Sequence, residues 1–377
     1  MLPTLIPALL LATLACQPPS QDSGPVDDTG PSHPCLQAGA DCTLAETATA
    51  RGVHAGAAVP NGPSDERLAA MTTHFDSATA ENAMKWGATC PTLGSCDYTQ
   101  ADAFMDFAEG ARLRIRGHTL VWGQSPGHGH PGDLATLAEQ ADDPYTFMEQ
   151  AITDHVTAMV GRYRGRVESW DVINEPLAPF GSTLDESVFY NAMGPDYLDL
   201  ALRVAHQVDP NARLFVNEYV VSDYDGDKAL AFVGLLDELM ARGAPIHGAG
   251  IQAHLYLEVP ELDALTALIA TIAALGLDVE LTEMDVAKLA LQEQLDDGED
   301  LFEAQAAAYG VLVQACLAEP RCTGVTTWGI DDGDSWLDSM PPYDAMAPHL
   351  PLLLDTDLQP KPAYHTVREL LASGGEA

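Results

Sequence analysis

Hydrophobic and polar positions along the chain form two kinds of segment, which alternate from about residue 50 onward. Short β-branched runs that end in polar residues alternate with longer Ala- and Leu-rich segments whose apolar residues recur with the helical period. The predicted strands are Gly52–Ala58, Ser77–Thr79, Arg112–Trp122, Val167–Ile173, Arg213–Asn217, Gly248–Gln252, Asp278–Thr282 and Gly324–Trp328. The predicted helices are Ser64–His74, Tyr98–Gly110, Pro144–Tyr163, Pro195–Asp209, Gly226–Arg242, Pro260–Leu275, Asp300–Ala318 and Pro362–Ala372.

This alternation predicts an all-parallel sheet, because parallel strands need crossover connections and the helices supply them. Eight strand–helix units of this length suit a closed α/β structure, the (β/α)8 TIM barrel. A doubly wound open sheet is the alternative, but its glycine-rich phosphate loop does not follow the first strand. We therefore expect one catalytic barrel domain over residues 46–377.

The N-terminus has the features of an export signal followed by a tether. The apolar run Leu2–Ala15 is too short to cross a hydrocarbon core of ~30 Å as a helix, and Cys16 follows it directly. A Cys after a small residue resembles a bacterial lipoprotein signal with Cys16 as the lipidation site; an ordinary secretory peptide is the alternative. We assign residues 1–16 to the signal and 17–45 to a Pro/Ser/Asp-rich tether. We expect an exported cell-surface or outer-membrane lipoprotein, or else a secreted protein.

The composition excludes several partners. With 46% hydrophobic residues in 377, the chain can bury a large core. Its 17 Lys and Arg against 56 Asp and Glu give a net charge of −39, which nucleic acid and anionic membranes repel. We therefore expect no nucleic-acid partner, and membrane contact only through a lipid on Cys16. A neutral or weakly charged substrate fits better.

The six other cysteines lie in three close pairs. They are Cys35 and Cys42, Cys90 and Cys96, and Cys316 and Cys322. Exported proteins keep disulfides, and pairing between neighbours is the simplest connectivity. A zinc site is the alternative, but the chain contains no CxxC and no His at ligand spacing to these pairs. We expect three disulfides.

Polar and aromatic residues gather at the predicted strand ends, which converge on one mouth of a barrel. In chain order they are Glu81, Asn82, Lys85, Trp86, His118, Trp122, Asn174, Glu175, Asn217, Tyr219, Gln252, His254, Glu283, Asp285, Trp328 and Trp336. The set has no Cys/His cluster for a transition metal, no phosphate loop and no Ser-His-Asp arrangement, so we expect no metal and no cofactor. Amides and carboxylates bind hydroxyls, and indole faces stack on sugar rings, which indicates a carbohydrate site.

Two carboxylates at these ends suggest a reaction. Glu175 follows the fourth predicted strand and Glu283 the seventh. Glycoside hydrolysis needs such a pair, because one acid protonates the leaving oxygen while the other carboxylate attacks the sugar or activates water. A single strand-end Glu is more often a solvated loop residue, but both of these end apolar strands.

Seven segments, in order, carry a resemblance to a known family. They are Glu81–Trp86, Gly117–Trp122, Trp170–Glu175, Gly250–Leu255, Leu281–Asp285, Thr326–Ile330 with Ser335-Trp336, and Pro351–Asp355 with Pro360–Tyr364. The chain resembles the endo-β-1,4-xylanases of glycoside hydrolase family 10 from about residue 50 to the C-terminus.

The resemblance implies a retaining double displacement. Glu175 would be the general acid/base and Glu283 the nucleophile. Asn174 would hold the sugar 2-hydroxyl, and His254 would bridge Glu283 and Asp285.

The resemblance also assigns substrate-binding residues. Those on the non-reducing side are Glu81, Asn82, Lys85, His118 and Gln252, with Trp122, Trp328 and Trp336 as an aromatic cage. Tyr219 would face the leaving group, and Gln124 would also contact substrate. The alternative for Glu81 and Lys85 is a plain i,i+4 helix pair, and for the tryptophans a core position.

The chain departs from the family pattern directly after Trp122. The family usually reads Trp-His-Ser-Gln-x-Pro, whereas this chain reads Gly123-Gln124-Ser125-Pro126 after Trp122, so a His of the site is missing. Val220 replaces a usual Asn. His128 and His130 follow in a Gly-rich segment, where we expect solvated side chains.

Together these observations predict a retaining endo-β-1,4-xylanase that acts on xylan or a related β-1,4-linked polysaccharide as a monomer. The alternatives are a retaining β-1,4-glycanase of other specificity and, because of the altered loop after Trp122, an inactive carbohydrate-binding barrel.

The net charge of −39 predicts a dependence of stability on salt. A fold with this excess of like charge repels itself at low ionic strength, and salt at ~1 M shortens the screening length to about 3 Å. We expect the melting temperature to rise with NaCl concentration, as measured by calorimetry. A flat or falling curve would contradict this view of the surface.

Overall fold

The computed structural model describes residues 33–37, 39–220, 224–292, 300–341 and 343–375. The predicted signal segment, Cys16 and residues 17–32 of the predicted tether lie outside the described residues. Within the described parts of the chain, no helix is both long enough and apolar enough to cross a membrane.

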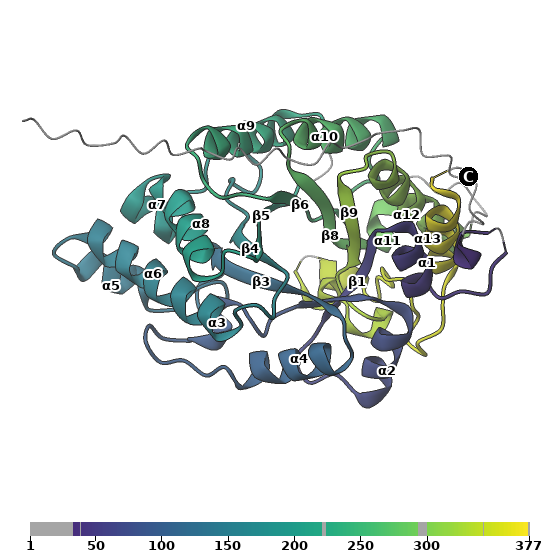
Figure 1. Ribbon diagram of the computed structural model, residues 1–377, viewed down its shortest axis with the longest axis horizontal. Coiled ribbons are helices and arrows are strands. Elements are labelled where there is room, and N and C mark those ends of the chain that lie inside the picture. Colours follow the sequence, from purple (N-terminus) through teal and green to yellow (C-terminus); the bar gives the residue numbers. More distant parts are fainter. Residues whose placement is uncertain (1–32, 38, 221–223, 293–299, 342, 376–377) are drawn as a thin grey trace, which may run out of the picture. The chain divides into compact units, whose positions relative to one another are not determined.

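Eight parallel strands form a closed ring at the centre of the fold (Figure 1). They are β1 (His54–Val59), β2 (Ser77–Ala80), β3 (Arg114–Trp122), β4 (Ser169–Asn174), β5 (Arg213–Glu218), β6 (Gly248–Ile251), β8 (Asp278–Val286) and β9 (Cys322–Thr327). Each strand pairs with the next, and β1 closes the ring by pairing with β9. The two-residue strand β7 (His254–Leu255) pairs with β8 beyond the end of β6. All eight predicted strands and the predicted (β/α)8 barrel are confirmed.

The helices surround this ring (Figure 1). The eight predicted ones are confirmed as α2 (Asp65–His74), α4 (Thr99–Gly110), α6 (Pro144–Arg162), α8 (Asp196–Val208), α9 (Asp227–Ala241), α10 (Leu262–Ala274), α12 (Leu301–Leu317) and α13 (Pro362–Ser373). Five shorter helices, which we did not predict, are α1 (Leu44–Arg51), α3 (Trp86–Thr89), α5 (Leu134–Gln140), α7 (Val188–Met193) and α11 (Lys288–Gln292). The strands β1 and β2 are buried almost throughout, as expected of strands covered by helices on one face and by the barrel interior on the other.

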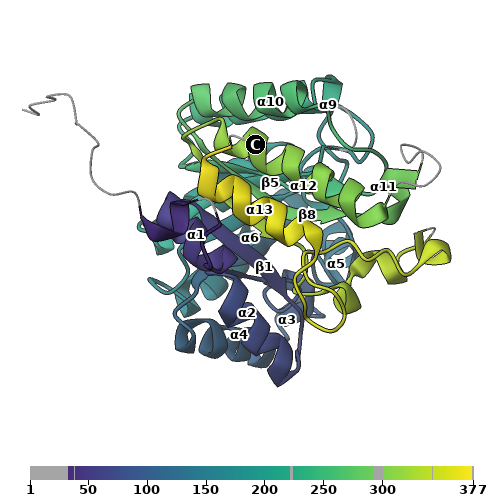
Figure 2. The ribbon, with the colours of Figure 1, turned by 90° about the vertical axis from the view of Figure 1, so that its right-hand side faces the viewer.

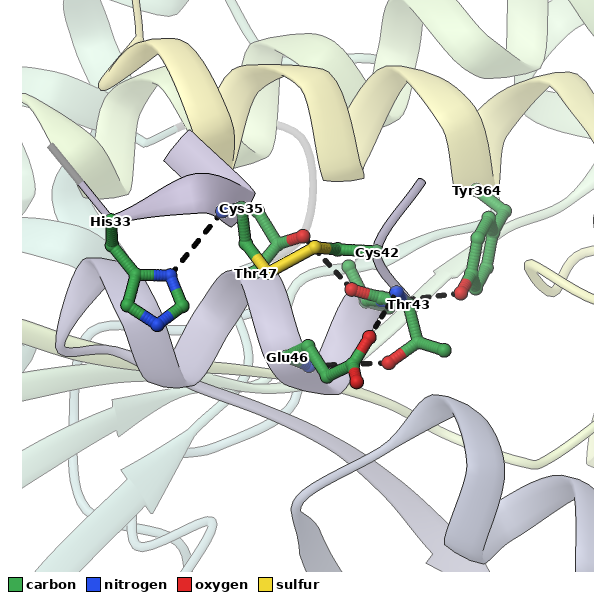
Figure 3. The surroundings of a disulfide bond; sticks show 8 residues. His33, Cys35, Cys42, Thr43, Glu46, Thr47 and Tyr364 are labelled. Atoms are coloured by element: carbon green, nitrogen blue, oxygen red, sulfur yellow. Dashed lines mark hydrogen bonds between the residues drawn. A yellow bond between two sulfur atoms is a disulfide. The ribbon is translucent and has the colours of Figure 1, made fainter. Parts of the chain in front are cut away.

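The first described residues pack against the C-terminal helix. Thr43 and Glu46 make a capping box at the start of α1, and the backbone N–H of Leu44 donates to the hydroxyl of Tyr364 on α13 at 2.8 Å (Figure 3). Figure 2 shows α1 beside α13. The folded structure therefore includes residues that the sequence analysis placed in the tether.

The three predicted disulfides are confirmed. Cys35 pairs with Cys42, as Figure 3 shows. The other two pairs are Cys90 with Cys96 and Cys316 with Cys322. The last pair joins the end of α12 to the first residue of β9, the strand that leads to Trp328.

A network of buried ion pairs lies inside the barrel and joins β3, β4 and β8. The guanidinium of Arg116 on β3, with its side chain 2% exposed, makes two hydrogen bonds to Asp171 on β4. It also donates to Glu280 on β8 at 2.8 Å, and Arg114 reaches the same Glu280 at 3.0 Å. Burial raises the pKa of both Asp171 and Glu280, but the neighbouring guanidinium charges outweigh burial and bring each pKa below its usual value. Arg116 therefore binds β4 and β8 to β3.

Removal of this guanidinium should destabilise the fold strongly. Arg116→Met leaves the buried Asp171 without its guanidinium partner and Glu280 with Arg114 alone, and breaking a buried pair in this way costs about 3–5 kcal/mol. The matched control is Arg162→Met, because Arg162 pairs with Asp102 while 42% exposed, and such surface pairs contribute about 0–1 kcal/mol. Urea denaturation measures both free energies of unfolding; equal losses in the two variants would contradict the role given to Arg116.

Candidate active site

A cavity of about 520 Å³ opens at the carboxyl ends of the strands. Among the predicted site residues, all but Asp285 line it, namely Glu81, Asn82, Lys85, His118, Trp122, Gln124, Asn174, Glu175, Tyr219, Gln252, His254, Glu283, Trp328 and Trp336. The structure therefore brings together residues that are spread over more than two thirds of the sequence.

Glu283, within β8, lies in a polar and buried setting. Its Oε1 accepts a hydrogen bond from the Asn217 amide at 2.6 Å, and its Oε2 lies 3.2 Å from Nε2 of His254. Burial tends to raise the pKa of Glu283. The hydrogen bond from His254 and the charges of His118 and His254 outweigh burial, so the pKa of Glu283 is lowered. Glu283 is therefore ionised at neutral pH.

His254, the first residue of β7, connects two carboxylates. Its Nδ1 lies 2.9 Å from Oδ2 of Asp285, and its Nε2 contacts Glu283. Burial lowers the pKa of His254, but the charge and hydrogen bond of Asp285, together with Glu283, raise it to about 10. The ring is thus an imidazolium that donates from both nitrogens. Asp285 also accepts a hydrogen bond from Trp336, whose indole N–H donates to Oδ2 at 2.7 Å.

Glu175 follows β4 and has the opposite electrostatic setting. Its backbone φ of +52° is strained for a residue with a side chain, and its N–H donates to the Asn217 carbonyl at 2.8 Å. Oε2 accepts from the indole of Trp122 at 2.8 Å and Oε1 from Gln252 at 3.0 Å. Burial is the main cause that raises the pKa of Glu175; the charge of Glu283 raises it further, and the hydrogen bonds from Gln252 and Trp122 offset only part of this rise. Two carboxyls in one cavity therefore differ in their readiness to hold a proton.

Asn217, at the end of β5, is a functional residue that we listed among the strand ends but did not place in the site. Its amide nitrogen binds both Asn174 Oδ1, at 2.8 Å, and Glu283 Oε1. Its own oxygen accepts from Thr282 at 2.7 Å, which fixes the orientation of the amide. A Cβ on Gly250 would lie 2.1 Å from that oxygen, so glycine is required there. Because the oxygen of Asn174 is taken, its N–H group remains for a ligand.

Lys85 contacts several residues on the side of the cavity that is predicted to bind the non-reducing sugars. Its ammonium donates to Asn82 Oδ1 at 3.0 Å and lies 5.0 Å from the ring of Trp122. Asn82 in turn donates to Glu81 at 3.0 Å. Burial lowers the pKa of Lys85, and carboxylates including Glu81 partly restore it. These residues form a hydrogen-bonded group. The alternative of an i,i+4 helix pair is wrong, because Glu81 and Lys85 precede α3, which begins at Trp86.

The tryptophans of the predicted cage also carry polar contacts. The indole N–H of Trp122 binds Glu175, and that of Trp336 binds Asp285. Trp328 is 7% exposed and packs edge-on against His118, with ring centroids 5.0 Å apart. The indoles of Trp122 and Trp336 thus orient carboxyl groups, and all three rings line the cavity.

Tyr219 and Gln124 also line the cavity. Lys228 lies 3.6 Å from the centroid of the Tyr219 ring, and its ammonium pairs with the buried Glu218 at 3.2 Å. The amide nitrogen of Gln124 is buried without a hydrogen-bond partner among the described residues, as suits a donor awaiting a ligand.

Seven further residues line the cavity and were missed by the sequence analysis. They are Ser125, His128, Pro179, Phe180, Tyr256, Met340 and Tyr343. Phe180 is 90% exposed, so its ring is available to a bound chain. Exposed aromatic residues in the loops after the strands were the available signal, but sequence gives no direction for a loop side chain.

The expectation that His128 and His130 are solvated is wrong. His130 is 2% exposed, its Nδ1 lies 3.0 Å from the Pro131 carbonyl, and its ring packs edge-on against Phe189. His128 is half-buried, lines the cavity and approaches Lys85. The loop after Trp122 folds back on the barrel, which a Gly-rich sequence does not reveal.

Comparison with known proteins agrees with this geometry. The chain is 32% identical over 297 residues to endo-1,4-beta-xylanase 2 of Claviceps purpurea, covering 79% of this chain and 80% of that protein. It is 34% identical over 312 residues to endo-1,4-beta-xylanase A of Humicola insolens, with coverages of 82% and 78%. Xylanase 10B from Thermotoga petrophila RKU-1, solved in complex with xylobiose, superposes with a TM-score of 0.77 at 28% identity, over 88% of this chain and 97% of that one.

The family model described as glycosyl hydrolase family 10 matches residues 43–370, which include all eight strands of the ring and every residue of the cavity. With a match of that extent, and relatives of more than 30% identity along most of their length, this chain belongs to glycosyl hydrolase family 10.

Proposed function

We propose that the protein is a retaining endo-β-1,4-xylanase that cleaves internal bonds of xylan, with Glu175 as acid/base and Glu283 as nucleophile. The observation that carries this proposal is two buried carboxyls in one cavity with different partners: His254 and Asn217 contact Glu283, whereas the neutral donors Trp122 and Gln252 contact Glu175. Family membership and relatives named endo-1,4-beta-xylanase support the choice of xylan.

In the first step, Glu283 attacks the anomeric carbon while Glu175 gives its proton to the leaving oxygen. Retaining hydrolases hold such carboxyls about 5–5.5 Å apart, where two anions repel by about 3 kcal/mol at an effective dielectric of about 20. This repulsion favours the proton on Glu175, whose burial already raises its pKa. The electron pair of the broken glycosidic bond goes to the leaving oxygen, which becomes a hydroxyl.

In the second step, Glu175 takes a proton from water, which attacks the anomeric carbon and releases Glu283. Once Glu283 is esterified its charge is gone, so one cause of the raised pKa of Glu175 disappears. The hydrogen bonds from Trp122 and Gln252 then stabilise the carboxylate form, which is the form that a base needs.

The surrounding residues orient and balance these two groups. His254 and Asp285 keep the nucleophile ionised and aimed, because the imidazolium donates to both carboxylates. Asn174 offers its N–H group to the sugar 2-hydroxyl, and Asn217 holds Asn174 and Glu283 in register. A contact to the 2-hydroxyl strengthens as the transition state gains oxocarbenium character.

The products formed from xylan test this proposal directly. The enzyme should cut internal bonds of soluble xylan, and each cut should create a new reducing end. NMR of the first product should show the β-anomer before mutarotation. A β-1,4-glucan as the better substrate would favour a glycanase of other specificity. No hydrolysis of either polymer, with binding retained, would favour an inactive carbohydrate-binding barrel.

Two substitutions separate the roles of the catalytic pair on an aryl β-xylobioside. Glu283→Ala should abolish attack on every substrate, because no nucleophile remains. Glu175→Ala should lose roughly 10²–10⁴-fold on xylan, the usual contribution of acid–base catalysis, yet still be glycosylated when the leaving group is good. Azide should then rescue its second step and give a β-glycosyl azide.

The pH profile of the same enzymes gives a second readout. The wild type should lose activity at low pH as Glu283 gains a proton and at high pH as Glu175 loses one. Glu175→Ala should lose the alkaline limb. Glu149→Ala, an exposed carboxylate on α6, is the control and should behave like the wild type. An α-azide, or an inverted product from the wild type, would contradict the assignment.

We propose further that the protein is exported. It is either anchored by a lipid on Cys16, with the tether between Cys16 and the barrel, or secreted. The three disulfides support an oxidising location.

Mass spectrometry of the mature N-terminus decides between these two forms. We expect a diacylglyceryl Cys16 and partition with membranes, because the small-residue–Cys boundary fits a lipoprotein signal. Cys16→Ser should move the protein to the soluble fraction without change in its activity. An unmodified N-terminus at another position would contradict lipidation.

A further inference from the structure

The loop that departs from the family pattern, residues 124–130, has a defined internal structure. The N–H of Gly127 donates to the His130 carbonyl at 2.7 Å. The N–H groups of His128 and Gly129 both donate to the Ser125 carbonyl, at 2.9 and 2.8 Å. These bonds close the loop on itself, so the position of His128 is set by the backbone.

Two glycines let this loop lie directly against the barrel. A Cβ on Gly87, in α3, would come within 2.6 Å of both the N and the O of His128. A Cβ on Gly129 would lie 2.3 Å from the Gln124 carbonyl and 2.9 Å from the Trp122 ring. Any other residue at either place would push the loop away from α3 and from Trp122.

The position that the family usually fills with histidine has no room for a side chain here. A Cβ on Gly123 would lie 2.4 Å from the Cβ of Ser187. In addition to His118 and His254, the cavity has an imidazole from five residues further along the chain, at His128.

The side chain of His128 faces Lys85. Its Nε2 lies 3.3 Å from the Lys85 ammonium, and its ring meets the Trp122 ring edge-on with centroids 5.9 Å apart. Lys85 is 6% exposed, and the only other hydrogen bond of its ammonium among the described residues goes to Asn82. Two of its three N–H groups are therefore engaged, and one remains for a ligand.

The donor chemistry of this contact fixes the state of the histidine. An ammonium has donors only, so Nε2 must accept, which requires a neutral ring with its proton on Nδ1. The charged groups that act on His128 are Lys85, before α3, and His118, on β3, and both oppose a second proton. With burial as the largest cause, they lower the pKa of His128 to about 4.

We propose that His128 is a positioning residue for the sugar on the non-reducing side: as a neutral acceptor it holds the Lys85 ammonium so that the third N–H points to a xylose hydroxyl. The ligand is a β-1,4-linked xylo-oligosaccharide, so this inference rests on the proposed function. In this chain the loop 124–130 thus supplies a site histidine, whereas the family pattern has its histidine at position 123.

Binding and kinetics together test the proposal. In His128→Ala, the dissociation constant of xylotriose and the KM for an aryl β-xylobioside should rise roughly tenfold, as expected for one lost charge-assisted hydrogen bond. The value of kcat should change by less than about threefold. Calorimetric binding of xylotriose needs no turnover, so an inactive wild type would refute the proposed function and leave this test intact.

His128→Gln separates an acceptor from a packing role. Its amide oxygen can accept from Lys85 but does not titrate, so affinity at pH 6 should return to within about threefold of the wild type. Between pH 6 and 4 the wild type should lose more affinity than this variant, because a protonated His128 would place two cations 3.3 Å apart. A Gln variant as weak as the Ala variant, or equal pH profiles, would overturn the proposal.

Gly87→Ala displaces the loop without altering the histidine. We expect the same rise in KM as in His128→Ala, because the added Cβ meets the His128 backbone. Gly234→Ala is the matched control, since that glycine lies in α9 with open space around it, and it should bind like the wild type. Wild-type affinity in either His128→Ala or Gly87→Ala would show that His128 does not position Lys85.

Discussion

The guanidinium of Arg116 contacts carboxylates on β4 and β8, the two strands that carry Glu175 and Glu283 toward the cavity. A charge buried to this extent is tolerated only when its partners stay in place, because the desolvation penalty of each ion is several kcal/mol. The distance between the carboxyls of Glu175 and Glu283 therefore depends on ion pairs deeper in the barrel. The same carboxylate, Asp171, also binds His118 at 3.0 Å, so the network reaches the floor of the cavity.

Lys and Arg are scarce in this chain, so the places where they pair with buried acids are informative. The chain has only 17 Lys and Arg, yet several of them lie inside the fold. Lys361 binds Asp332 at 2.8 Å, Lys228 binds Glu218 at 3.2 Å, and Lys85 lies among the carboxylates of the cavity. The surface is left strongly acidic, while the interior has cations where buried acids need them. An uncharged polysaccharide is a substrate that such a surface does not repel.

The cavity uses this balance to give two similar carboxyls different tasks. Glu283 has the imidazolium of His254 and the amide of Asn217 as partners. Glu175 has only neutral donors, Trp122 and Gln252, and burial dominates its pKa. Lys85 contacts His128, which lies in the loop where the chain departs from the family pattern.

The sequence by itself determined the barrel and most of the site. Alternating periodicity located all eight strands and the eight principal helices, because strands buried on both faces and amphipathic helices differ in their spacing of apolar residues. Strand-end position identified Glu175, Glu283 and His254 as members of one cavity, since parallel strands of a barrel end on the same side. The cysteine pairs were also correct, because short loops leave little choice of partner.

Only the tertiary structure decided how side chains from different units meet. Asn217 bridges Asn174 and Glu283, which lie 43 and 66 residues away in the sequence, and no local pattern encodes such a contact. The ring of His130 packs against Phe189, on another element, and the approach of His128 to Lys85 depends on the space left by Gly87. A Gly-rich segment has the same local pattern whether it is solvated or packed, so its fate is set by the surface it meets.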